Sequence, residues 1–94
     1  MKIIWAESVK LDLQDIEDYI SKDNPLAAYN TVITIIEKTE ILLSRNSAIG
    51  RAGRLAGTRE LVIAKTPYVV PYTIKDNYIH ILRVIHEARQ WPQV

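Results

Sequence analysis

The triplet Asp23-Asn24-Pro25 divides the first half of the chain into two segments whose apolar residues recur at helical spacing. The Asn24 side chain is suited to cap a helix that starts after it, and Pro25 suits the first helical position because its missing N–H would have no partner there. We therefore expect one helix from about Glu7 to Ser21 and a second from Pro25 to about Arg45. Helices joined by so short a link are expected to pair as an antiparallel hairpin.

Both expected helices carry an apolar stripe that we interpret as core. The first stripe consists of Val9, Leu13, Ile16 and Ile20, and the second of Ala28, Val32, Ile35, Ile36, Thr39, Leu42 and Leu43. The acids of the first helix lie mostly off its stripe, and they are concentrated in its first half, where they favour the positive end of the helix dipole.

The other apolar segments predict β-strands. The run from Lys2 to Trp5 is short and β-branched, which is typical of a strand. Three further strands are expected from Arg59 to Ala64, from Tyr68 to Lys75 and from Tyr78 to His86, separated by Lys65-Thr66-Pro67 and by a two-residue turn at Asp76-Asn77. Together these three strands predict an antiparallel meander.

Two positions in this meander need a special arrangement. Proline cannot donate to a strand ladder, so we expect a bulge or a one-sided edge at Pro71. The last strand is apolar on both faces, with Ile79, Ile81 and Ile85 alternating with Leu82 and Val84. We expect one face to pack on the helices and the other, carrying Arg83, to be an apolar surface that a partner covers.

These elements predict a single α+β domain over residues 1–94, in the order β-α-α-β-β-β, with the helical hairpin packed on a mainly antiparallel sheet. The side chains expected to be buried are Leu13, Ile16, Ile20, Val32, Ile35, Leu42, Leu61, Leu82 and Val84.

The segment from Asn46 to Thr58 is expected to be a loop. It contains all three glycines of the chain, interleaved with Arg51 and Arg54. It lacks the Gly-Lys-Ser/Thr ending of a phosphate-binding loop and the glycine spacing of a dinucleotide fingerprint, so we exclude a nucleotide site here.

Several classes of protein are disfavoured by composition. The chain has no cysteine and two histidines, so neither a disulfide framework nor a metal centre is expected, and no cofactor is expected. The first residues lack the pattern of a signal peptide, and no apolar run approaches the roughly 20 residues of a membrane span. We expect a cytoplasmic protein without a membrane partner.

Charge is divided unequally between the two halves. Residues 1–44 contain four lysines against eight acids, a net of −4, whereas residues 45–94 contain eight basic residues against three acids, a net of +5. All six arginines lie in the second half. A basic half suggests an anionic partner, either nucleic acid or an acidic protein segment, although small domains also segregate charge by chance.

Short motifs across nearly the whole chain resemble the RelE/ParE toxins of type II toxin–antitoxin systems. They are Trp5 before the first helix, Asp18-Tyr19-Ile20, Asp23-Asn24-Pro25, Gly50-Arg51, Gly57-Thr58-Arg59-Glu60-Leu61-Val62, Pro67-Tyr68-Val69-Val70, Ile81-Leu82-Arg83-Val84-Ile85-His86 and Arg89-Gln90-Trp91-Pro92. The expected order of elements is also that of the family.

The resemblance implies a cognate antitoxin as partner. In this family the antitoxin's disordered tail folds over the toxin, and its folded half binds operator DNA, so DNA contact would be indirect for this chain. We expect antitoxin carboxylates to meet five arginines, namely Arg51, Arg54, Arg59, Arg83 and Arg89.

RelE-like members cleave messenger RNA on the ribosome by attack of the ribose 2′-hydroxyl on the neighbouring phosphate. If this chain does so, Arg59, Arg83 and His86 are the catalytic candidates, as phosphate clamp and proton-transfer group, with Glu60 or Arg89 assisting. The alternative is that the two arginines pair with the antitoxin and that His86 bonds to backbone. The chain has no lysine-rich stretch, and Trp91 stands where RelE-type members have a tyrosine.

ParE-like members are not enzymes and poison DNA gyrase. The near-neutral charge, the acidic helical hairpin and the Arg-x-Trp-Pro ending are closer to this branch, which we favour. Trp91 and Pro92 are then the candidate target-binding residues, unless they form a hydrophobic plug that closes the core. A third hypothesis is a non-toxic module that retains only the antitoxin interface.

Overall fold

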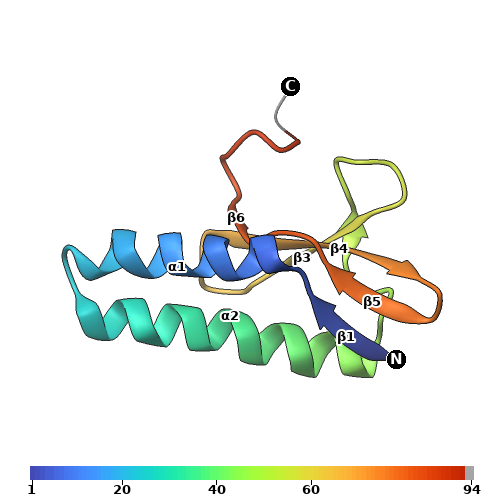
Figure 1. The fold of residues 1–94 in the computed structure, drawn as a ribbon, viewed down its shortest axis with the longest axis horizontal. Coiled ribbons are helices and arrows are strands. Elements are labelled where there is room, and N and C mark those ends of the chain that lie inside the picture. The colour runs from blue at the N-terminus through green and yellow to red at the C-terminus, as the bar shows by residue number, and fades with distance from the viewer. Residues whose placement is uncertain (93–94) are drawn as a thin grey trace.

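The computed structural model describes residues 1–92 and confirms the helical hairpin. Helix α1 spans Glu7–Ser21 and helix α2 spans Pro25–Arg45. The Asn24 side chain accepts a hydrogen bond from the Ala27 N–H at 3.0 Å, and Pro25 occupies the first turn, as the sequence predicts. The two helices lie side by side along one face of the sheet (Figure 1).

A sheet of six strands forms the second layer within the described residues. The strands are β1 (Lys2–Trp5), β2 (Arg51–Ala52), β3 (Arg59–Val62), β4 (Tyr68–Lys75), β5 (Tyr78–Ile81) and β6 (Ile85–His86). Their order is β1-β5-β4-β3-β2, with β6 also paired to β4. Only the β1–β5 pairing is parallel, so the predicted α+β class and mainly antiparallel sheet are confirmed.

One strand lies inside the segment expected to be a loop. Strand β2 pairs with the start of β3, and the Gly53 N–H donates to the Thr58 carbonyl at 2.9 Å. The intervening residues therefore form a hairpin connection, called here the β2–β3 loop, that rises away from the helices (Figure 1). The turn at Asp76-Asn77 has positive φ at both residues (53° and 66°), as a two-residue hairpin of this type requires.

The prediction of a continuous last strand was wrong, and Pro71 explains the break. Tyr72 pairs with Ile81 and Val69 with Ile85, so two residues of β4 face three residues of the neighbouring segment. The Leu82 N–H donates to the Pro71 carbonyl at 2.9 Å. The Pro71 carbonyl therefore points toward residues 82–84. The ring nitrogen, which has no N–H to donate, faces the same side. The expected bulge exists, but it lies on the strand opposite the proline.

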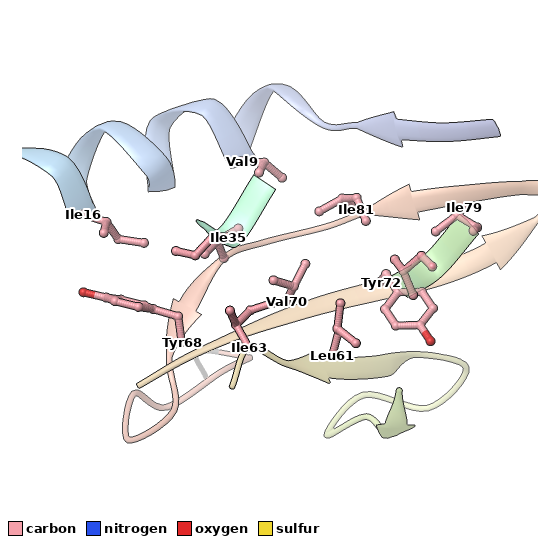
Figure 2. Packing of buried hydrophobic residues seen from close by; sticks show 12 residues of the cluster. Val9, Ile16, Ile35, Leu61, Ile63, Tyr68, Val70, Tyr72, Ile79 and Ile81 are labelled. Carbon is pink, nitrogen blue, oxygen red and sulfur yellow. The ribbon is translucent and has the colours of Figure 1, made fainter. Parts of the chain in front are cut away.

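The core lies between the hairpin and one face of the sheet. Val9 and Ile16 of α1 point toward the sheet, where Val9 lies near Ile81 and Ile16 near Tyr68 (Figure 2). Among the residues expected to be buried, Ile16, Ile35, Leu61 and Val84 are so. Leu13, Ile20, Val32, Leu42 and Leu82 are only partly buried. The first four flank the core cluster, and Leu82 lies in the bulge.

The prediction that the Arg83 face of the last strand would be exposed was wrong. Ile79 and Ile81, and with them Arg83, lie on the side that packs against the helices, not on an exposed surface. The charged Arg83 side chain can lie on the helix side because Asp12 of α1 binds its guanidinium at 2.7 and 2.9 Å. A cation is tolerated at the edge of an apolar layer when a carboxylate partners it there.

Candidate functional site

A groove of about 550 Å³ runs between α1 and the β3–β4 turn. Apolar side chains from both layers line it, together with aromatic rings, two cations and two acids. These are Asp12, Asp15, Ile16, Tyr19, Ile20, Thr31, Lys65, Thr66, Pro67, Tyr68, Val84, Ile85, His86 and Arg89. A depression of this mixed character suits a segment with both apolar and acidic side chains.

Tyr68 and His86 meet at one wall of this groove. Their rings are edge to face with centroids 5.8 Å apart. Burial raises the pKa of the Tyr68 hydroxyl above its ordinary value of 10.0, and the nearby Tyr19 adds to this shift. His86 accepts a hydrogen bond from the Ala88 N–H at Nδ1 over 3.1 Å. The proton of the neutral ring is therefore on Nε2.

A second charged group lies on the sheet face away from the helices. Glu60 pairs with Pro71 across the β3–β4 ladder, whereas its neighbour Leu61 faces the core, so Glu60 points to the opposite side. The Glu60 side chain is 1 % exposed. Arg51 and Arg54 bind it through Nη2 at 3.2 Å and Nε at 3.3 Å, and Arg51 also binds Glu87 at 3.2 Å. We call these four residues the Glu60 cluster.

The C-terminal tail, residues 87–92, is attached to this cluster. Arg54 donates from Nη1 to the Arg89 carbonyl at 2.7 Å and from Nη2 to the Glu87 carbonyl at 3.0 Å. Arg54 and the tail line an open depression of about 410 Å³. Trp91 is partly buried and Pro92 is exposed, and within the described residues neither belongs to the hydrophobic core.

Of the three candidate catalytic residues, Arg59 lies apart from His86, and both arginines are bound by other parts of the fold. Arg59 donates to the Ala48 and Gly50 carbonyls at 3.1 and 2.9 Å. It pairs with Tyr72, four residues along β4 from the Tyr68 that pairs with His86, which is roughly 13 Å of strand. Arg83 points to Asp12 on α1. Both arginines thus have internal partners, and Asp12, the partner of Arg83, lines the same groove as His86.

The structural roles of two buried acids, Asp12 and Glu60, were not predicted from the sequence. Asp12 was not singled out, although it stands three residues after Val9 and four before Ile16, on the apolar stripe of α1. An acid at such a position is a signal for a buried partner. Glu60 was named only as a possible assistant in catalysis, and its position directly before the apolar run Leu61–Ala64 gave a weaker signal.

Within the described residues, no group of three or more His, Cys, Asp or Glu side chains is arranged to hold a metal ion. Among the same residues, none of the helices has the length and apolar character required to cross a membrane.

Comparison with known proteins gives concordant matches. A family model described as "ParE toxin of type II toxin-antitoxin system, parDE" matches residues 3–91. The putative toxin Y4kP of Sinorhizobium fredii is 42% identical over 93 residues, which cover 99% of this chain and 95% of that protein. Toxin RelE2 of Caulobacter vibrioides is 34% identical over 90 residues, which cover 94% of this chain and 97% of that protein.

Solved structures are similar as well. A chain of the chromosomal ParDE system from P. aeruginosa superimposes with a TM-score of 0.82 at 30% identity, covering 92% of this chain and 95% of that one. A chain of the RelBE2 toxin–antitoxin complex from Mycobacterium tuberculosis gives a TM-score of 0.63 at 22% identity, covering 90% of this chain and 95% of that one. The second likeness concerns the fold alone.

Proposed function

Because the chain belongs to the ParE toxin family of type II toxin–antitoxin systems, we propose that it arrests bacterial growth by binding and poisoning DNA gyrase, and that a cognate antitoxin neutralises it. It acts in this proposal as a binding protein, not as an enzyme. Operator DNA is contacted only through the antitoxin.

The observation that carries this proposal is that both candidate catalytic arginines, Arg59 and Arg83, are held by internal contacts. Cleavage of RNA by its own 2′-hydroxyl needs a proton acceptor and a cation around one phosphate. Here Arg59 binds backbone carbonyls, and Arg83 is paired with Asp12. Assembling a nuclease site from these residues would require breaking internal contacts of both arginines, which favours a function without bond cleavage.

The groove is the proposed antitoxin site. Its floor includes Ile16, Ile20 and Ile85, which suit apolar side chains, and its rim carries Lys65 and Arg89. Of the five arginines expected to meet the antitoxin, Arg51, Arg54, Arg59 and Arg83 have internal partners. Within residues 1–92 the Arg89 side chain has no hydrogen-bond or ion-pair partner, so we place the principal carboxylate contact there and assign a lesser share to the other four.

Purified chain added to gyrase and supercoiled DNA tests the target. We expect linear DNA to accumulate after protein removal, because a poison traps the cleaved complex, and we expect induction in cells to cause an SOS response before any loss of message. The antitoxin should suppress both effects. Message cleavage without DNA breaks would reject gyrase in favour of the RelE-like activity, and no growth arrest would favour the inert module.

Charge reversal tests the antitoxin site. Lys65→Glu with Arg89→Glu should weaken antitoxin binding by at least about tenfold, which is 1.4 kcal/mol, more than one exposed ion pair provides. Lys75→Glu, at the end of β4 and outside the groove, is the matched control. Unchanged affinity and unchanged salt dependence in the double variant would exclude these two cations as contacts.

A further inference from the structure

Glu60 is a buried carboxylate whose two oxygens are both bound. Oε1 accepts from Arg51 Nη2 at 3.2 Å, and Oε2 accepts from the Arg54 backbone N–H at 3.0 Å and lies 3.3 Å from Arg54 Nε. A carboxylate that is only 1 % exposed is stable there only with such partners. Glu60 therefore fixes both the backbone and the side chain of Arg54.

The other edge of the same guanidinium holds the tail. While Nε faces Glu60, Nη1 and Nη2 donate to the carbonyls of Arg89 and Glu87 at 2.7 and 3.0 Å. The planar guanidinium of Arg54 thus connects Glu60 of β3 to the backbone carbonyls of Glu87 and Arg89, which lie 33 and 35 positions after Arg54. A lysine has the same charge but no fork that could span these acceptors.

Two further contacts hold the start of the tail. The Glu87 N–H donates to the Pro67 carbonyl at 2.7 Å, and the Glu87 carboxylate binds Arg51 at 3.2 Å. The segment leading to Trp91 is thereby held over the sheet face opposite the helices, beside the β2–β3 loop. Both rise from that face in Figure 1.

We propose that Glu60 and Arg54 are positioning residues for the tail, and that the toxin's target recognises the tail in the position they impose. The identity of the target rests on the proposed function; the positioning does not. A segment ordered before binding loses less conformational entropy on binding. Release of the tail should therefore weaken toxicity even when every residue of the tail is retained.

Trp91 reports the position of the tail directly. The chain has two tryptophans, so Trp5→Phe leaves Trp91 as the single fluorophore. In that background Arg54→Lys and Glu60→Gln should raise the quenching of Trp91 by acrylamide toward its value in urea and should lower its anisotropy. Arg45→Lys, the same change in the last turn of α2, should leave both measurements unchanged.

Growth arrest provides the activity readout, because it does not depend on which target is correct. Arg54→Lys should lose toxicity to the extent that truncation after Glu87 does, with circular dichroism showing a folded chain. Arg54→Lys is the milder change and keeps the test valid if Glu60→Gln does not fold.

The outcomes separate the two proposals. Trp91 equally shielded in the wild type and in both variants overturns the positioning, whatever the gyrase assay shows. A released tail with full growth arrest overturns recognition of the positioned tail. Growth arrest without gyrase poisoning rejects the proposed target, while a released tail with lost toxicity still supports the inference. A wild-type chain that does not arrest growth overturns the proposed function and the recognition of the tail by a target, and leaves the positioning to the Trp91 measurement.

Discussion

Replacing Asp12 with alanine should cost more stability than any other single acidic-to-alanine change on α1. The Asp12 side chain is 8 % exposed and accepts three hydrogen bonds. Two come from the Arg83 guanidinium at 2.7 and 2.9 Å, and the third comes from the Val84 N–H at 3.0 Å. The variant would leave a partly buried cation and a buried backbone donor without these acceptors.

The magnitude follows from those contacts. Removing one member of a buried ion pair costs about 3–5 kcal/mol, mainly because the remaining charge is left without compensation. The Arg83 side chain retains 29 % exposure, so water can hydrate it in part, and we expect the lower end, about 3 kcal/mol. In a domain of this size 1 kcal/mol shifts Tm by about 4–8 °C, which predicts a fall of about 12–24 °C.

Urea denaturation followed by circular dichroism measures this difference. Asp12→Asn should be intermediate, because its carbonyl oxygen can still accept from the Val84 N–H while the charge is lost. Asp15→Ala, an exposed acid one turn away, should change the free energy of unfolding by less than about 0.5 kcal/mol. If Asp12→Ala unfolds at the wild-type urea concentration with the same slope, the pair does not stabilise the fold and this reasoning is refuted.

Three further predictions concern other parts of the molecule. His86→Ala should remain toxic in growth assays, because a gyrase poison needs no proton transfer, whereas a nuclease would lose about 10²–10⁴-fold in rate. Tyr68 should ionise later than an ordinary tyrosine in an absorbance titration, since burial raises its pKa. The unfolded chain ionises first, so stability should fall as pH rises above 10.0, and Tyr68→Phe should weaken that fall. Gly50→Ala should destabilise by about 1–3 kcal/mol in urea, because its Cβ would lie 2.7 Å from the Tyr72 ring; an unaffected midpoint would argue against this close packing.

The elements that depend on local chemistry were predictable from the sequence. The start of α2 is determined by the capping side chain of Asn24 and by the proline ring of Pro25. Both residues lie directly at the helix start, so the sequence alone reveals the boundary. The turn at Asp76-Asn77 likewise depends on residues that tolerate positive φ. Alternation in β5 was also visible, but alternation alone does not say which face meets the helices.

Contacts between distant segments were not predictable. Arg83 was expected on the exposed side because the opposite face of the strand was expected to pack on the helices. Its partner Asp12 lies 71 positions away in the sequence. The same limit applies to the arginines that were expected to meet an antitoxin. Arg51 and Arg54 find their acids in Glu60 and Glu87, and this pairing depends on the β2–β3 hairpin and on the path of the tail.

The parallel pairing of β1 with β5 has a consequence for how the chain folds during synthesis. Lys2 pairs with Tyr78 and Trp5 with Ile81, so the first strand has no sheet partner until more than four fifths of the chain has been made. The helical hairpin is synthesised early, before the strands that cover its apolar face. Asp12 has no Arg83 partner until that later part of the chain is made. Long-range closure of this kind is slow relative to local helix formation. A prematurely terminated product lacks the strands that complete the sheet, so it has neither the groove nor the tail.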